Sequence, residues 1–248
     1  LISYCKKKKI KFLSTAFDIE NLKFLIKNKI DFIKIPSGEI TNFPLLEYIK
    51  KSNKKILLST GASTLSEVKT ALKILNKKKK EITVLQCNSA YPTPIKHLNL
   101  NTLTTFRKKF NCEVGLSDHS LSVVAAAAAV SLGATIIEKH FTLSRDMIGP
   151  DHKSSLEPSE LKRMIQNIRE IESALGSFNK NITKSERENR RIIRKSLVAN
   201  NFIKKGQKFT SKNIFAKRPA GGISPMNIKK ILGKKAKKNF ELDEVIKI

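Results

Sequence analysis

Two of the four histidines in this 248-residue chain follow short apolar runs at matching positions. His119 follows Cys112–Leu116 (CEVGL), and His140 follows Ala134–Glu138 (ATIIE). Both runs are typical of buried strands, and the Ala/Val-rich segment between them is typical of a packed helix. Two imidazoles at the ends of adjacent parallel strands could bind one divalent cation. Either histidine alone is more often structural, but the matching positions favour a metal site.

The repeating unit of the chain up to Leu175 is a short apolar run followed by a helical pattern. Predicted strands cover residues 11–17, 31–37, 55–61, 82–88, 112–116 and 134–138. Helical patterns cover residues 18–28, 42–52, 64–76, 100–110 and 158–175, and Gly176 stops the last one. Alternating strands and helices predict parallel strands joined by right-handed crossovers.

Polar residues follow every predicted strand, which favours an α/β barrel. A doubly wound sheet binds ligands only near its switch point, whereas a (β/α)8 TIM barrel builds its site from all strand ends. The polar residues at these ends are Ser14, Thr15, Lys34, Ser37, Ser59, Thr60, Asn88, Ser89, Ser117 and Glu138. Six strands are two fewer than a closed barrel needs. Because the chain begins with Leu1 rather than Met, we expect it to lack about the first two strands.

The composition changes twice after this region, which predicts three segments. Residues 1–178 form the partial barrel, and residues 179–194, polar and highly charged, form a partly helical linker. Residues 195–248 form a small domain with a thin core. Its segment SLVANNFIKKGQKFT predicts two short strands around a KKGQ turn.

The formal net charge of +28 permits a nucleic-acid binder, which would bind with steep salt dependence. However, the cations are mostly lysines spread along the chain, and tryptophan, a good base-stacking residue, is absent. We therefore expect no nucleic-acid partner and a basic surface that attracts anionic substrates. No apolar run is long enough to span a membrane, and the three widely spaced cysteines are typical of reduced thiols. We expect a cytoplasmic protein with no membrane partner.

Eight short motifs occur together in this chain. They are STAFD (14–18), KIPSGE (34–39), LSTGAS (58–63), CNSAYPTP (87–94), GLSDH (115–119), EKHFTL (138–143), GPDHKSSLEP (149–158) and KRPAGGISP (217–225). In this order they closely resemble the sialic acid synthase family over essentially the whole chain. The C-terminal region resembles the antifreeze-like SAF domain, which has a β-clip fold.

The resemblance implies a (β/α)8 barrel followed by an SAF domain, in a domain-swapped homodimer. It implies the condensation of phosphoenolpyruvate with an N-acylated amino sugar, such as N-acetylmannosamine or a diacetylated relative. The products are a nonulosonic acid and phosphate, and the cofactor is Mn²⁺ or another divalent cation such as Mg²⁺ or Co²⁺. The GPDHKSSLEP loop is more similar to the neuraminate and legionaminate branch than to the pseudaminate branch.

The motifs carry the family's site residues onto this chain. His119 and His140 match the metal ligands, and Asp151 and Arg218 match residues that contact the sugar, with Arg218 reaching the partner's site. Residues matching the phosphoenolpyruvate site are Thr15, Lys34, Ser59, Asn88, Tyr91 and Ser117.

Glu39 and Glu138 are the two acids near the predicted mouth, and either could transfer protons during the reaction. The alternative for both is a buried hydrogen-bonding role. The alternatives for the other charged residues are a lysine reaching solvent at Lys34, a turn residue at Asp151 and a surface arginine at Arg218.

One departure concerns the first two strands, because the acidic residue and lysine that the family uses there have no counterpart. We therefore expect this chain alone to be inactive or poorly folded. Alternatives are a pseudaminic acid or spore-coat polysaccharide synthase of the same family, and a noncatalytic remnant whose SAF domain mediates association.

Overall fold

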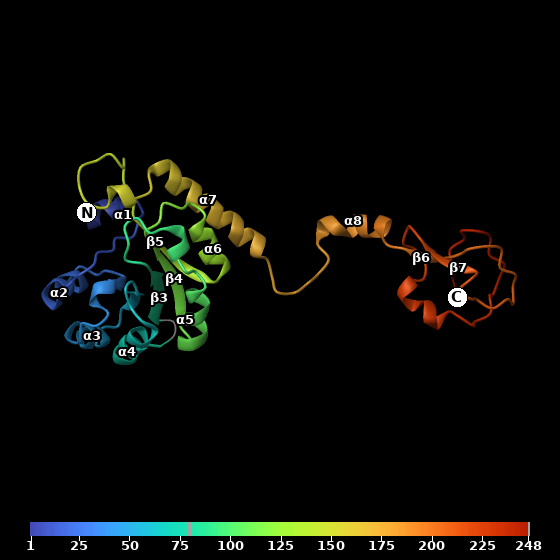
Figure 1. Cartoon of the computed structure of the whole chain (residues 1–248), viewed down its shortest axis with the longest axis horizontal. Helices are drawn as coiled ribbons and strands as arrows, with labels where there is room; N and C mark the ends of the chain where they lie inside the picture. Colours follow the sequence, from blue (N-terminus) through green and yellow to red (C-terminus); the bar gives the residue numbers. More distant parts are fainter. Residues whose placement is uncertain (79–80, 248) are drawn as a thin grey trace. The chain divides into compact units, whose positions relative to one another are not determined.

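The computed structural model describes residues 1–78 and 81–247. They form two compact units, Leu1–Gly176 and Ser177–Ile248, which are described separately below (Figure 1). No helix among these described residues is long and apolar enough to cross a membrane.

The first unit is built on five parallel strands whose order in the sheet follows their order in the chain. The strands are β1 (Phe32–Ile35), β2 (Lys55–Ser59), β3 (Ile82–Cys87), β4 (Glu113–Asp118) and β5 (Ala134–Lys139). This order has no reversal, so it matches one arc of a barrel rather than a doubly wound sheet.

The predicted strand over residues 11–17 is wrong in extent. Only Thr15 pairs, through one parallel bridge to Lys34 on β1. Lys11 and Leu13 are exposed, so the segment has little burial to hold it against the single neighbouring strand. The six predicted strands are therefore five strands and one bridge.

A helix precedes or follows each strand, and the helices lie along the sheet in chain order (Figure 1). They are α1 (Ile2–Lys7), α2 (Ile19–Lys27), α3 (Phe43–Lys50), α4 (Leu65–Leu75), α5 (Thr102–Phe110), α6 (Ala125–Ser131) and α7 (Pro158–Leu175). Short 3-10 helices cover Ser37–Glu39, Ile95–His97 and His152–Ser154. Asp18 caps α2 by accepting a hydrogen bond from the Asn21 N–H, and Thr64 and Glu67 form a capping box on α4.

Alternate strand residues determine which side chains reach the helices. Ile33 and Ile35 on β1 and Val114 and Leu116 on β4 belong to the main core, together with α3, α4 and α5. Successive side chains of a strand point to opposite faces, so the residues that alternate with these core residues face the other side of the sheet. Lys34 and Ser117 are such residues.

A β-bulge between Val114 and Gly115 shifts the register of β4 against β5. A Cβ atom on Gly115 would lie 2.5 Å from the carbonyl oxygen of Ile136 and 2.5 Å from Cδ2 of Leu85. Only glycine fits this close approach. After the bulge Ser117 pairs with Glu138, so both strands end in the same phase.

The second unit consists of α8 (Lys184–Ile193) and a small β domain. Strand β6 (Ser196–Ala199) pairs antiparallel with β7 (Ile214–Lys217), and a 3-10 helix covers Pro225–Lys230. The predicted KKGQ turn forms, since the Gln207 N–H donates to the carbonyl of Lys204 at 2.9 Å, but the predicted strands around it are wrong because Ile203 pairs with Phe240 and Lys208 with Lys235. Phe209 and Phe240 fill the core, with ring centroids 5.8 Å apart.

Candidate functional site

Three side chains from separate strands converge at the carboxyl edge of the sheet. The Ser117 hydroxyl donates a 2.6 Å hydrogen bond to Oε1 of Glu138. Nζ of Lys34 lies 3.4 Å from the same oxygen, and the Lys34 side chain is only 8% exposed, compared with 37% for Glu138. The Lys34 ammonium therefore lies below the surface, beside a carboxylate that remains accessible.

Ser59 ends β2 at the same edge. Its Oγ is the one buried side-chain polar atom without a hydrogen-bond partner among the described residues. Buried hydroxyls are normally paired, so an unpaired one requires an explanation. A substrate oxygen at this edge would supply the missing partner.

The two histidines lie together with Tyr91. The ring centroids of His119 and His140 are 5.1 Å apart, and the Tyr91 ring stacks on His119 with centroids 4.2 Å apart. Nδ1 of His119 lies 2.7 Å from the carbonyl oxygen of Asn88. If Nδ1 donates this bond, Nε2 carries the free lone pair that a metal requires.

The electrostatics keep His119 neutral. Burial lowers the pKa of His119, and neighbouring His140 lowers it further, while the bond to Asn88 and the charges of Glu138 and Asp118 oppose the shift. Neutral imidazole is the form that binds metals.

These residues fit a divalent cation bound by two protein ligands. No cluster of three or more His, Cys, Asp or Glu side chains that could hold a metal exists in the described part of the chain. Oδ2 of Asp151 lies 3.9 Å from Nδ1 of His140. A cation here would therefore take its remaining ligands from water or substrate, which leaves room for a reacting group.

Three predicted residues do not join this cluster directly. The side-chain amide of Asn88 donates to the carbonyl of His97 at 3.3 Å, so Asn88 reaches the site through its main-chain oxygen. Glu39 accepts a 2.6 Å bond from the side chain of Asn42, at the start of α3. Thr15 is half-buried beside Lys34 through its bridge.

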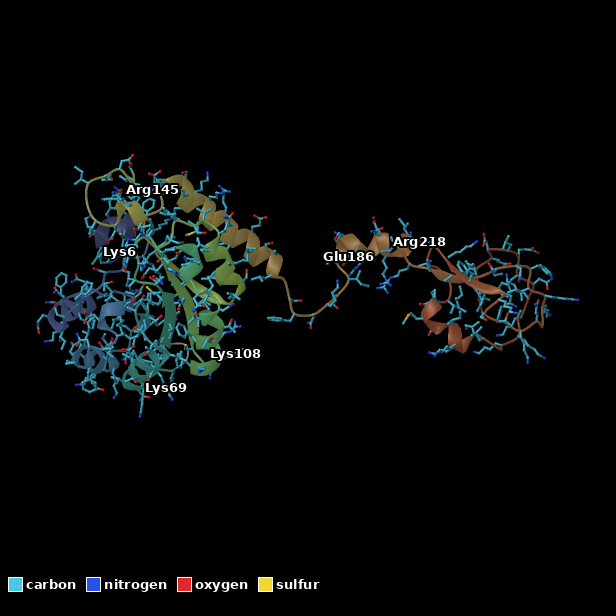
Figure 2. The ribbon with its side chains drawn as sticks, viewed as in Figure 1. Lys6, Lys69, Lys108, Arg145, Glu186 and Arg218 are labelled. Carbon is cyan, nitrogen blue, oxygen red and sulfur yellow. The ribbon has the colours of Figure 1, made fainter. Side chains whose placement is uncertain are left out.

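The predicted sugar-binding residues lie in different units. Asp151 is in the loop between β5 and α7, with φ of 68°, and its carbonyl accepts a 2.7 Å bond from the Ser155 hydroxyl. Arg218 is in the second unit, where Nε donates to the carbonyl of Ile193 at 3.0 Å (Figure 2).

The loop that carries Asp151 is fastened by Arg145, which the motifs do not identify. Arg145 is labelled in Figure 2. Its guanidinium donates to both oxygens of Glu160, at 2.7 and 3.1 Å, and its backbone N–H donates to Oε1 of Glu157. The position of Arg145 before a predicted helix start with Glu157 and Glu160 is the only sequence signal for this contact.

A buried ion pair is also absent from the sequence prediction. Asp118 and Lys139 directly precede His119 and His140, and Oδ2 of Asp118 lies 2.7 Å from Nζ of Lys139. The two side chains are 0% and 4% exposed. Burial lowers the pKa of Lys139, and Asp118 opposes that shift.

Comparisons with known proteins agree over both units. The model of the NeuB family matches residues 1–180, and that of the SAF domain matches residues 194–248. The chain is 49% identical to the N,N'-diacetyllegionaminic acid synthase of Campylobacter jejuni, covering 100% of this chain and 75% of that protein. It is 37% identical to a pseudaminic acid synthase of the same species, covering 94% of this chain and 68% of that protein.

A crystal structure of the N-acetylneuraminic acid synthetase of Leptospira borgpetersenii superimposes with a TM-score of 0.71 at 36% identity. The superposition covers 76% of this chain and 66% of the Leptospira borgpetersenii chain. The matches confirm the predicted barrel-type α/β fold followed by an SAF domain.

Proposed function

Because this chain belongs to the NeuB family, we propose that it condenses phosphoenolpyruvate with an N-acylated amino sugar to give a nonulosonic acid and phosphate. The observation that carries the proposal is the convergence of Lys34, Ser117 and Glu138 beside the His119–His140 pair. Lys34, Ser117 and Glu138 come from β1, β4 and β5, so one sheet edge would supply both an anion site and a cation site.

Phosphoenolpyruvate would bind at the edge formed by Lys34 and the hydroxyls. Its phosphate and carboxylate need a positive charge and a hydrogen-bond donor, which Lys34 and the unpaired hydroxyl of Ser59 would offer. The unpaired hydroxyl of Ser59 supports this placement because a bound oxyanion would satisfy it.

The reaction needs groups that accept and return protons. Carbon 3 of phosphoenolpyruvate forms a bond to the aldehyde carbon of the open-chain sugar, and the aldehyde oxygen takes up a proton. Water then adds to carbon 2 and loses a proton. The bond between carbon 2 and the phosphate oxygen breaks, which leaves a keto acid and phosphate. Glu138 is the better placed base for the water, since Glu39 is engaged with Asn42.

A divalent cation such as Mn²⁺ bound by His119 and His140 would polarise the sugar aldehyde as a Lewis acid. The protein orients His119 by the Asn88 carbonyl and the Tyr91 ring, so little reorganisation accompanies binding.

For the sugar we propose a diacetylated substrate, as in the legionaminic acid synthase of Campylobacter jejuni, with Asp151 contacting hydroxyls. The pseudaminic acid relative at 37% identity makes its substrate the second candidate. We further propose a cytoplasmic homodimer in which Arg218 contacts the N-acyl group in the partner's site.

The test is an assay of phosphate release with Mn²⁺ and phosphoenolpyruvate. N-acetylmannosamine and the diacetylated sugar substrates of legionaminic acid and pseudaminic acid synthases are supplied in turn. Mass spectrometry identifies each product. The proposal predicts release only with sugar present and loss of release in H119A/H140A, and such release would also overturn the expectation that this chain alone is inactive. Equal release without sugar, or none with any sugar from a folded chain, would contradict the proposal and favour a noncatalytic role.

A further inference from the structure

The Asp118–Lys139 pair lies on the opposite side of the sheet from the two histidines. Successive strand residues face opposite sides, and Leu116 and Ile137 both pack into the core beneath the helices. Asp118 and Lys139 continue that phase, two residues further along each strand. His119 and His140 follow them and continue the opposite phase, which Ser117 and Glu138 share.

The pair also encloses the main chain around His119. Oδ1 of Asp118 accepts a 2.8 Å hydrogen bond from the N–H of Ser120, and Nζ of Lys139 donates to the carbonyl of Ser120. Asp118 and Lys139 are themselves paired in the β4–β5 register. The residues on both sides of His119 are therefore tied to the residue before His140.

Stability alone does not explain such a pair. Removing two charges from water costs much of what their attraction returns, and apolar side chains of similar size usually stabilise a core as well or better. A pair with 0% and 4% exposure at this place requires another role.

We propose that Asp118 and Lys139 are positioning residues that fix the spacing of the His119 and His140 imidazoles for a divalent cation. The inference rests on the proposed function, because the metal site belongs to it. Neither side chain touches the cation. They act by holding two strand ends in one register, so that both imidazoles reach a single ion with metal–nitrogen distances correct to about 0.2 Å.

The experiment is a titration of the purified chain with Mn²⁺, in which electron paramagnetic resonance measures the concentration of free Mn²⁺ at each step. The main variant is D118N/K139M, which leaves no lone buried charge. The second variant, D118E, keeps both charges and lengthens one side chain. The control is R169Q/E172Q, which removes an exposed ion pair on α7.

We expect D118N/K139M and D118E to weaken Mn²⁺ binding by about 10- to 100-fold, as outer-shell changes at metal sites do, while the control binds like the unmodified chain. Urea denaturation shows which variants are folded. If D118N/K139M is not folded, the Mn²⁺ affinity of D118E tests the inference. A folded variant that binds within about twofold of the unmodified chain would overturn the inference.

A different result would identify failure of the proposed function. If the unmodified chain binds no more Mn²⁺ than H119A/H140A, the metal site itself is wrong and the positioning role falls with it. If the unmodified chain binds tightly and the positioning variants do too, only the positioning role is wrong.

Discussion

Substitution of Gly115 by alanine should damage both stability and metal binding. The new Cβ would lie 2.5 Å from the Ile136 carbonyl oxygen, whereas carbon–oxygen contacts between strands are normally about 3.3 Å or longer. The atoms must therefore separate by about 0.8 Å, and although the Leu85 side chain could turn aside, the β5 backbone could not. A metal site tolerates errors of only about 0.2 Å in its ligand distances.

We expect G115A to lose about 1–3 kcal/mol of unfolding free energy, the usual cost of overpacking a core. The displaced β5 should also move His140 away from His119 and weaken Mn²⁺ binding by at least about tenfold. Urea denaturation and Mn²⁺ titration measure the two effects. The matched control is G38A, because a Cβ on Gly38 meets nothing within 4 Å. A G115A protein with the stability and Mn²⁺ affinity of G38A would refute the reasoning.

Three further substitutions separate the roles of the site residues. S59A should keep the free energy of unfolding within about 1 kcal/mol, because the hydroxyl has no partner to lose, but should raise KM for phosphoenolpyruvate; an unchanged KM would contradict its role. E138Q should lower kcat by about 10²- to 10⁴-fold, the usual contribution of an acid–base group, and steady-state phosphate release measures it. R145M should raise KM for the sugar and not for phosphoenolpyruvate, since Arg145 fastens the loop that carries Asp151; parallel changes in both constants would point to general misfolding.

The parallel sheet and its polar edge could be predicted from the sequence, because strand residues alternate between the helix-covered core and the opposite face of the sheet. Ile33 and Ile35 bracket Lys34 in the apolar pattern, so their burial predicts that Lys34 faces the other side. The segment around Thr15 has the composition of a strand but lacks the buried partner that would extend its single bridge. The composition of a segment indicates its propensity to form a strand, whereas strand pairing also requires neighbouring segments that bury it.

The orientation of side chains at the edge could not be predicted in the same way. Asn88 belongs to a motif, yet its amide points to His97 and its carbonyl serves His119. The Asp118–Lys139 contact depends on the bulge at Gly115, which sets the register of β4 against β5. The Asn88–His119 and Asp118–Lys139 contacts join residues 31 and 21 positions apart, so the local sequence pattern carries little information about them.

The stacking of Tyr91 on His119 gives the site its own optical reporter. The chain has no tryptophan and only three tyrosines, so its intrinsic fluorescence comes from few sources. The other two, Tyr4 and Tyr48, belong to α1 and α3, whereas the Tyr91 ring lies 4.2 Å from His119 and 5.7 Å from His140. A paramagnetic ion between the imidazoles would quench the emission of Tyr91, because this ring lies against both histidines. Occupancy of the site can thus be followed by fluorescence, without a label.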